Sequence, residues 1–522
     1  MVEFDAMKTP SQPLSREEWI RLILSMTLFF SLIVRVFPGL LAGFPLNDGG
    51  MFLSMIHDLR ANGFALPAFT TYNHANIPFA YPPLGFYVGA FLATLGISAV
   101  DVLRWLPVTV NFLSIPAFYL LAKTLLKEEP RAVVATALFA LVPSSFSWQI
   151  MGGGLTRAFG VLFILLALYS AHEMFQRGSW KFVILSILFC SLAVLSHPEV
   201  SLATVTGCAL FWLFFGRTQR GILQAALVAL GTLLLTAPWW GTVIARHGLA
   251  PFEDVFHSGA YTSIPLLGLF NELFSFDVWM GLFRLLVIAG IVWSLFRREY
   301  FFVAWLAIPY LIEPRSAAAF AFFPECIVAA GLFIDGLPTL IDWIKKKRGL
   351  AVPQVEFTQR TGLSLLLFGI MILWFVQNAL YDIALVNTSL KPPDPQQAMQ
   401  WVRDHTPPDS QFLILTGNLG VMTDPIQEWF PAWSDRHSQS TLQGLEWTLG
   451  PQFFPRLGQL AELQKCRDVS CVEAWSGKTG LTYTHILLEK SDWMQPMLDS
   501  LKADANYSLL FENDQEAVFQ LK

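Results

Sequence analysis

The chain has 522 residues, of which 54% are hydrophobic and only 14% are charged, whereas an ordinary soluble domain carries roughly 25% charged residues. The formal net charge of −5 is spread thinly, and no long basic segment is interleaved with aromatic residues, so nucleic-acid binding is excluded. The apolar residues instead form blocks of roughly 15 to 22, near the length of a bilayer-crossing helix. The composition therefore predicts a polytopic α-helical membrane protein.

Eleven apolar blocks are predicted to cross the bilayer. They lie at residues 20–37, 105–123, 133–149, 159–173, 181–197, 199–215, 222–243, 279–296, 300–312, 317–340 and 361–381. The first block has a long acidic leader and no small-x-small cleavage pattern, so it is expected to be an uncleaved helix. A further block, Tyr81–Ile97, is predicted to be interfacial or re-entrant, because a full crossing there would reverse the charge rule at every later loop.

Loop charges predict which side each loop faces. If the N-terminus is cytoplasmic, the short loops on that side hold most of the basic residues, including Lys345–Arg348. The loops on the other side hold only a few arginines: Arg60, Arg104, Arg157, Arg246 and Arg315. An odd number of spans then places everything after Asp382 outside. The expected location is the cell membrane, with multiple passes, a cytoplasmic N-terminus and an extracytoplasmic C-terminal domain.

Two domains are expected: a transmembrane domain of residues 1–382 and a more polar extracytoplasmic α/β domain of residues 383–522. In the second domain a helix is predicted at Pro395–His405. Alternating apolar patterns bounded by Pro and Gly predict four strands: Gln411–Thr416, His485–Glu489, Tyr507–Phe511 and Ala517–Leu521.

The cysteines divide by their surroundings. Cys190, Cys208 and Cys326 lie in apolar blocks and are expected to pack as small hydrophobic residues. Cys466 and Cys471 lie in a polar stretch, where a short disulfide forms if the segment turns. Such a bond requires an oxidising compartment, and the sequence leaves open whether it exists.

Asp48 is the first candidate for chemistry. It follows the first span and is followed by two glycines, so its carboxylate is placed to meet a substrate approaching from both lipid and water. The alternative is that Asp48 only caps the next helix, a common position for aspartate.

Tyr81-Pro82-Pro83-Leu84 opens the re-entrant helix, and Arg104 lies at the mouth of the second span. An arginine in such a place either extends to lipid phosphates with no special role or binds a substrate phosphate through paired N–H donors.

Three further outer turns carry polar residues. One has the glycines 152–154 followed by Arg157, which would let the backbone approach a ligand closely unless it is only a flexible linker. The other two are His197-Pro198-Glu199 and Glu313-Pro314-Arg315. Charged residues in so apolar a context usually have a partner or a task, although a polar cap and a structural ion pair would look the same.

Several other chemistries lack support. The sequence has no P-loop, HExxH, CxxC or GxSxG motif with a suitable triad, so zinc, nucleotide-hydrolysis and serine chemistry are not expected. Arg284 and Glu325 lie inside predicted spans but do not make a proton relay. A transporter is disfavoured because neither broken-helix pairs nor inverted repeats are visible.

Taken in order, the single acid Asp48, the motif at Tyr81, the outer Arg104 and the polar tail resemble the GT-C superfamily of membrane glycosyltransferases, in particular its protein mannosyltransferase and lipid A aminoarabinose transferase branch. This resemblance implies transfer of a sugar from a polyprenyl-phosphate-linked donor to a glycan, lipid or protein acceptor at the outer face of the bilayer. It gives Asp48 the role of general base and implies phosphate contacts for outer arginines such as Arg315. Single displacement would invert the anomeric carbon.

The sequence departs from the family pattern around its acid. Asn47 precedes Asp48 and Gly49 follows it, where many relatives have a second acid, and the second outer loop also lacks one. No cofactor is firmly implied, and a divalent metal has little support, because hard cations need several oxygen ligands.

A non-catalytic membrane protein is the alternative function, in which the C-terminal domain binds a glycan or a partner. The aromatic and acidic stretches Glu428–Arg436 and Gly444–Trp447 suit such contacts, or they serve as interfacial anchors.

Overall fold

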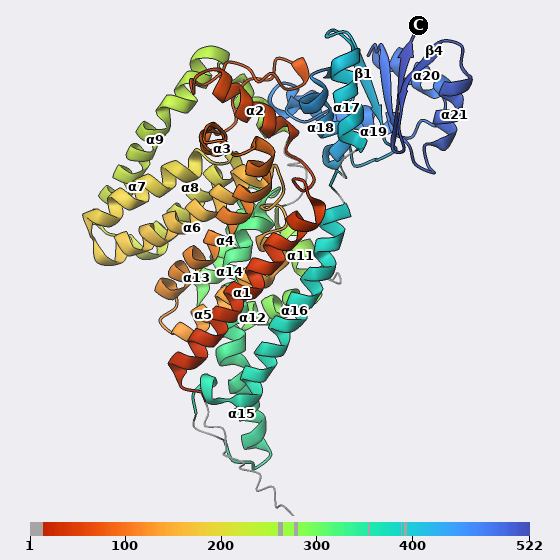
Figure 1. Ribbon diagram of the computed structural model, residues 1–522. Helices are drawn as coiled ribbons and strands as arrows, with labels where there is room; N and C mark the ends of the chain where they lie inside the picture. Colours follow the sequence, from red (N-terminus) through yellow and green to blue (C-terminus); the bar gives the residue numbers. More distant parts are fainter. Residues whose placement is uncertain (1–13, 259–264, 276–279, 353–354, 388, 391–393) are drawn as a thin grey trace, which may run out of the picture.

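The computed structural model describes residues 14–258, 265–275, 280–352, 355–387, 389–390 and 394–522. A long bundle of helices occupies most of the molecule, and a small sheet with its own helices lies at one end (Figure 1). Helices α2 and α3 lie at this same end, whereas α15 lies at the opposite end. The two ends of the bundle therefore carry very different structures.

Seven helical segments among the described residues are long and apolar enough to cross a bilayer. They are α1 (Arg16–Ala42), α4 (Ala99–Leu125), α6 (Gly154–Arg177), α8 (Pro198–Phe215), α9 (Gln219–His247), the continuous segment Ala317–Lys347 and α16 (Thr361–Asn387). The segment Ala317–Lys347 contains α14 (Ala317–Gly331), a π-helical turn and α15 (Leu337–Lys347). The prediction of a polytopic helical membrane protein is confirmed.

Shorter apolar helices occupy the remaining predicted spans. They are α5 (Glu129–Leu141), α7 (Trp180–Val194), α12 (Gly281–Phe296) and α13 (Tyr300–Ile312). Each predicted span thus overlaps a helix, although α5 ends eight residues before the predicted end at 149. These four helices have 13 to 16 residues, fewer than the roughly 20 that a crossing ordinarily needs. The number of eleven crossings stays a prediction.

The helix expected to be re-entrant is short. Helix α3 (Leu84–Thr94) has 11 residues, about half the length needed to cross the hydrocarbon core. Its neighbours are α2 (Gly50–Ala61), α4 and α6. Two other short helices are α10 (Ala250–His257) and α11 (Pro265–Phe274).

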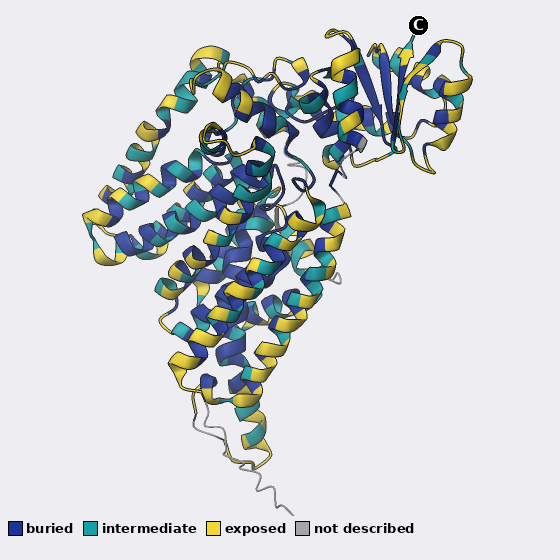
Figure 2. Ribbon diagram, in the orientation of Figure 1, coloured by how far each residue is buried: buried dark blue, intermediate teal, exposed yellow. Residues whose placement is uncertain are grey.

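The bundle has a buried core and an apolar exterior. Buried residues follow the inward faces of the helices, and exposed residues follow the outward faces (Figure 2). Many of the exposed side chains are large and apolar, such as Leu234, Ile184 and Leu365, which is the surface that lipid requires.

Two buried arginines inside the bundle have hydrogen-bond partners on other helices. Arg35 of α1 is fully buried and donates to Asn111 Oδ1 at 2.7 Å and to the Ala140 carbonyl at 2.8 Å. Arg284 donates to Glu325 Oε2 at 2.8 Å. These contacts satisfy the donors that burial would otherwise leave exposed to an apolar medium, and they join helices that are distant in the sequence.

The C-terminal residues form a five-stranded mixed sheet in the order β2-β1-β3-β5-β4. Its strands are β1 (Gln411–Leu415), β2 (His437–Ser438), β3 (His485–Glu489), β4 (Tyr507–Glu512) and β5 (Glu516–Leu521). The first three strands are parallel, and β5 is antiparallel to β3 and β4. The sheet contains all four predicted strands.

Helices cover the sheet: α17 (Asp394–His405), α18 (Pro425–Ser434), α19 (Phe453–Leu463), α20 (Val469–Thr479) and α21 (Gln495–Ala503). Helix α17 matches the helix predicted from sequence. Cys466 and Cys471, just before and within α20, are joined by a disulfide, which answers the question that the sequence left open. The two-domain division at residue 382 stays a prediction, although α16 continues beyond it to Asn387.

Candidate active site

Asp48 lies in the short loop between α1 and α2, at the end of the bundle that carries the sheet. Its Oδ1 accepts a hydrogen bond of 2.8 Å from the Gly153 N–H. Its Oδ2 has no hydrogen-bond partner in the described part of the chain. One oxygen therefore fixes the carboxylate and the other remains available to a ligand.

The glycines 152–154 pack against Asp48. A Cβ at Gly153 would overlap the Asp48 carboxylate, and one at Gly152 would overlap the Asp48 carbonyl oxygen. The sequence suggested that these glycines let the backbone approach a ligand. A close approach is indeed required, but it is an approach to Asp48.

Gly153→Ala should therefore displace the Asp48 carboxylate while leaving the fold intact. If Asp48 acts in catalysis, we expect kcat to fall about 100-fold, because small misplacements of a reacting group have effects of that order. Gly241→Ala in α9 is the matched control, since a Cβ there meets nothing within 4 Å. Equal activity of the two variants would show that the position of this carboxylate is unimportant.

Burial governs the protonation of Asp48. Removal from water raises its pKa, while the positive charge of Arg157 and the Gly153 N–H oppose the rise. Asp48 also has an acidic neighbour, Glu428, whose pKa burial and the Asp48 charge raise to about 8. Asp48 and Glu428 therefore both have pKa values above those of ordinary carboxyl groups.

Glu428 reaches this loop from α18 of the C-terminal domain. Its Oε2 accepts from the Gly49 and Gly50 N–H groups at 3.0 and 2.9 Å, and its Oε1 accepts from Met51 N–H at 3.0 Å. The next residue, Trp429, donates from Nε1 to the Asn47 carbonyl at 3.0 Å. The C-terminal domain is thus bound directly to the backbone that carries Asp48.

A cavity of about 310 Å³ lies at this end of the bundle. It brings together six of the eight residues singled out from the sequence: Tyr81, Arg157, His197, Glu199, Glu313 and Arg315. The C-terminal domain adds Glu446 and Trp447 to its lining. The residues come from outer turns that are far apart in the chain, so their meeting depends on the tertiary fold.

Some buried polar atoms that face this cavity lack partners. Arg157 Nη1, Glu446 Oε2 and Trp239 Nε1 are buried and have no hydrogen-bond partner within the described residues. Leaving such groups unpaired is costly, so the cavity is chemically prepared for a polar ligand. Arg157 offers a positive charge to it, and Glu446 offers an acceptor.

The other charged groups of the cavity interact with one another. Arg315 Nε lies 3.6 Å from Glu199 Oε1. His197 Nδ1 accepts from the Glu199 N–H at 3.3 Å, as a helix cap. Burial and the charges of Arg157 and Arg315 hold the pKa of His197 well below its usual value. His197 is therefore a neutral wall of the cavity rather than a third cation.

Two predicted residues lie apart from the cavity lining. Arg104 donates to the Gly39 carbonyl at 2.9 Å and lies over the Trp105 ring, so it joins α4 to the end of α1. Asp48 also does not line the cavity, but Arg157, which does, is close enough for its charge to lower the pKa of Asp48. Arg157 is thus the link between the acid and the cavity.

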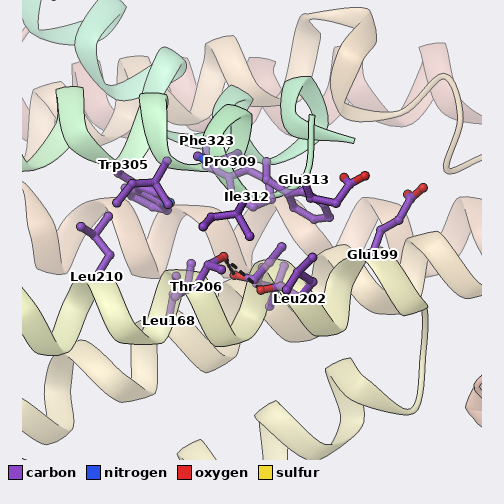
Figure 3. Close-up of a pocket in the computed structure, with 15 residues that line it drawn as sticks. Leu168, Glu199, Leu202, Thr206, Leu210, Trp305, Pro309, Ile312, Glu313 and Phe323 are labelled. Carbon is purple, nitrogen blue, oxygen red and sulfur yellow. Dashed lines mark hydrogen bonds between the residues drawn. The ribbon is translucent and has the colours of Figure 1, made fainter. Parts of the chain in front are cut away.

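A narrow apolar groove continues from the cavity between α8 and α13. Glu199 and Glu313 lie at one end of it, and Leu210 and Trp305 lie at the other (Figure 3). Glu199, Leu202 and Glu313 line both the groove and the cavity. The free space in the groove is only about 20 Å³, so apolar side chains must rotate before a chain can enter.

The comparisons with known proteins agree on one architecture. The family model of dolichyl-phosphate-mannose-protein mannosyltransferases matches residues 80–241. The oligosaccharyltransferase AglB of Archaeoglobus fulgidus, solved with an inhibitory peptide and a dolichol-phosphate, matches with a TM-score of 0.54 at 14% identity, over 91% of this chain and 69% of AglB. ArnT of Cupriavidus metallidurans, bound to undecaprenyl phosphate, matches with a TM-score of 0.53 at 14% identity, over 97% of this chain and 98% of ArnT.

The chain has the GT-C fold. The resemblance expected from the order of the sequence motifs is confirmed. No curated protein sequence matches the chain.

The sequence does not determine the roles of two acids of the C-terminal domain. Glu428 and Glu446 lie in aromatic stretches that suited either ligand contact or membrane anchoring. The structure places Glu428 on the Asp48 loop and Glu446 in the cavity. No local signal in the sequence distinguishes these acids from surface carboxylates, because their partners belong to the transmembrane domain.

Metal binding finds no ready-made site. The described residues contain no group of three or more His, Cys, Asp or Glu side chains arranged to hold an ion. Asp48 and Glu428 are neighbours, but both Glu428 oxygens already accept backbone N–H groups. The donor set here does not fit the several oxygen ligands that a hard cation requires.

Proposed function

We propose that this protein is a membrane glycosyltransferase that transfers a sugar from a polyprenyl-phosphate-linked donor to an acceptor hydroxyl on the extracytoplasmic face. The continuity of the cavity and the groove carries this proposal. A cationic, polar cavity that leads into an apolar groove between two membrane helices matches an amphiphile with an anionic head and a long hydrocarbon tail. AglB and ArnT, which share the fold, were solved with lipids of this kind.

The chemistry divides among three groups. Asp48 Oδ2, the free carboxylate oxygen, takes the proton of the acceptor hydroxyl as that hydroxyl attacks the anomeric carbon. Arg157 and Arg315 stabilise the negative charge that grows on the departing lipid phosphate. The rings of Tyr81 and Trp447, whose centroids are 5.6 Å apart, form one aromatic wall of the cavity for the sugar to pack against. One displacement of this type inverts the anomeric configuration.

The orientation follows from two observations. The distribution of basic residues among the loops supports an outer location for the cavity and the C-terminal domain. The disulfide between Cys466 and Cys471 supports that side, because such bonds persist in oxidising compartments. Of the acceptor, the proposed chemistry specifies only the hydroxyl that attacks the sugar.

Blocking the groove should test the lipid part of the proposal. Thr206→Trp places a bulky ring in the groove, so we expect KM to rise about tenfold for a donor with a long polyprenyl chain and to stay constant for one with about two isoprene units, since each lost buried CH₂ is worth ~0.8 kcal/mol. Val205→Trp is the control, because Val205 is 63% exposed on another face of the helix. Equal KM changes for both donors would place the lipid tail elsewhere.

A further inference from the structure

The N-terminus of α2 is capped from the other domain. The first N–H groups of a helix have no partner within it, and a neighbouring Asp, Ser or Thr ordinarily accepts their hydrogen bonds. Gly49, the residue at the cap position, has no side chain to do so. Glu428 performs this task instead, from a position 379 residues further along the chain.

This arrangement releases Asp48 from the role that its position in the sequence favours. Asp48 lies one residue before the cap position, where an aspartate can accept from the backbone N–H two residues on, yet its carboxylate faces Gly153 and the charge of Arg157. The N–H groups of residues 49–51 are already occupied by Glu428. Asp48 therefore has no competing partner at the helix terminus.

The contact is part of a rigid and buried interface. Glu428 is 3% exposed, and the Tyr72 hydroxyl donates to its carbonyl oxygen at 2.6 Å. Trp429 is fully buried and donates to the Asn47 carbonyl. A Cβ on Gly50 would overlap the Glu428 backbone, so these two segments of the chain can lie this close together only because residue 50 is a glycine.

We propose that Glu428 is a positioning residue for the transfer reaction: by capping α2 in place of Asp48, it keeps the Asp48 carboxylate on the Gly153 N–H, at the start of the helix whose Arg157 lines the cavity. This inference rests on the proposed function. Without Glu428, the Asp48 carboxylate turns to the vacant N–H groups of α2 and is lost to the reaction, while the helix remains capped. The C-terminal domain then acts in catalysis without touching the reacting atoms.

Charge adds a second effect to this geometry. Asp48 is faced by Glu428 from α18, by Arg157 from α6 and by Tyr72, and Glu446 interacts in turn with Arg157. Two neighbouring carboxylates disfavour each other's ionisation. Because burial, helped by the Asp48 charge, raises the pKa of Glu428 to about 8, Asp48 ionises first and Glu428 is neutral where the acid limb lies. An Asp48 that turns to the N–H groups of α2 gains hydrogen bonds to its charged form, which should move the acid limb of the activity profile to lower pH.

Glu428→Gln tests the proposal in the full-length protein. We expect kcat to fall about 100-fold, as for other small displacements of a catalytic group, with KM for the donor within about twofold and the acid limb shifted to lower pH. Glu428→Asp keeps a carboxyl group that can cap α2 and should retain the limb of the parent protein. In hydrogen exchange, the amides of residues 49–51 should keep most of their protection in Glu428→Ala, because Asp48 replaces the missing cap.

Asp435→Asn is the matched control. Asp435 ends the same helix and contacts His74 at 2.9 Å across the same interface, but both side chains are largely exposed and neither touches the Asp48 loop. Its kcat and pH profile should equal those of the parent. If Glu428→Gln behaves as this control does, or if it raises KM and lowers the melting temperature without moving the pH profile, the proposal is overturned.

Two further measurements keep the outcomes distinct. If Glu428→Gln does not fold, Trp429→Phe removes the hydrogen bond to Asn47 together with part of the buried ring and should lower kcat about tenfold; unchanged kcat would then contradict the proposal. If the parent protein transfers no sugar from any polyprenyl donor, the proposed function fails. Exchange of the 49–51 amides still reports on the cap in that case, and complete loss of their protection in Glu428→Ala would show that Asp48 does not take its place.

Discussion

Asp48→Asn should lower kcat about a thousandfold, the middle of the range for loss of a general base, without changing the fold. Asparagine has the same shape and keeps an oxygen that accepts the Gly153 N–H, so the loop should be undisturbed. It cannot take a proton from the acceptor hydroxyl. Purified variant and parent proteins, supplied with the same polyprenyl-linked donor, would show the loss as reduced turnover at unchanged donor affinity.

Asp101→Asn provides the comparison, because Asp101 is an acid in the first turn of α4 that lines neither the cavity nor the groove. Its turnover should match that of the parent. Undiminished transfer by Asp48→Asn would remove Asp48 from the mechanism.

The pH dependence of activity in the parent protein is a second test of Asp48 as the general base. A base acts only when ionised, and burial raises the pKa of Asp48. Activity should therefore be complete above this raised pKa and be lost as the pH falls through it, at a higher pH than the roughly 3.9 of an ordinary aspartate. This acid limb should be absent from the residual activity of Asp48→Asn.

Arg157→Ala should have the second largest effect, a fall in kcat of about 100-fold, which is the order expected when one group that stabilises a developing negative charge is removed. Arg157 is the residue common to the acid and the cavity, and its Nη1 has no partner among the described residues. Because its charge lowers the pKa of Asp48, the variant should also lose activity at a higher pH than the parent does.

Arg104→Ala is the control for Arg157→Ala, because it shows whether the loss of any arginine on the outer side lowers kcat in the same way. Arg104 contacts the Gly39 carbonyl and the Trp105 ring, so its removal should reduce stability and leave the acid limb in place. If Arg104→Ala and Arg157→Ala gave the same kinetic profile, the cavity would not be the phosphate site.

The sequence predicts the secondary structure well, because long apolar helices and short alternating strands have different periods. The strand at His485–Glu489 has the predicted bounds. Strand β2 was missed because its two residues are too few to show a pattern. The number of crossings stays open for a similar reason, since helices such as α5 are apolar but short.

The candidate site could be predicted only in part. Loop charges place Arg157, His197 and Arg315 on one side of the bilayer, and one cavity does contain all three. Arg104 satisfies the same rule and lies elsewhere, because sidedness does not determine distance. The roles of Glu428 and of Gly153 depend on contacts with a loop that is far away in the sequence, and no local pattern records such contacts.

The order of the chain has a consequence for biosynthesis. The ribosome completes the membrane helices, with the groove between them, before it reaches Glu428, which lies 379 positions after Gly49. A nascent or truncated chain could therefore accommodate lipid while its first loop still lacked its cap. Under the proposed mechanism, turnover begins only after the last domain has left the ribosome, folded and docked, so unfinished copies do not consume the activated sugar.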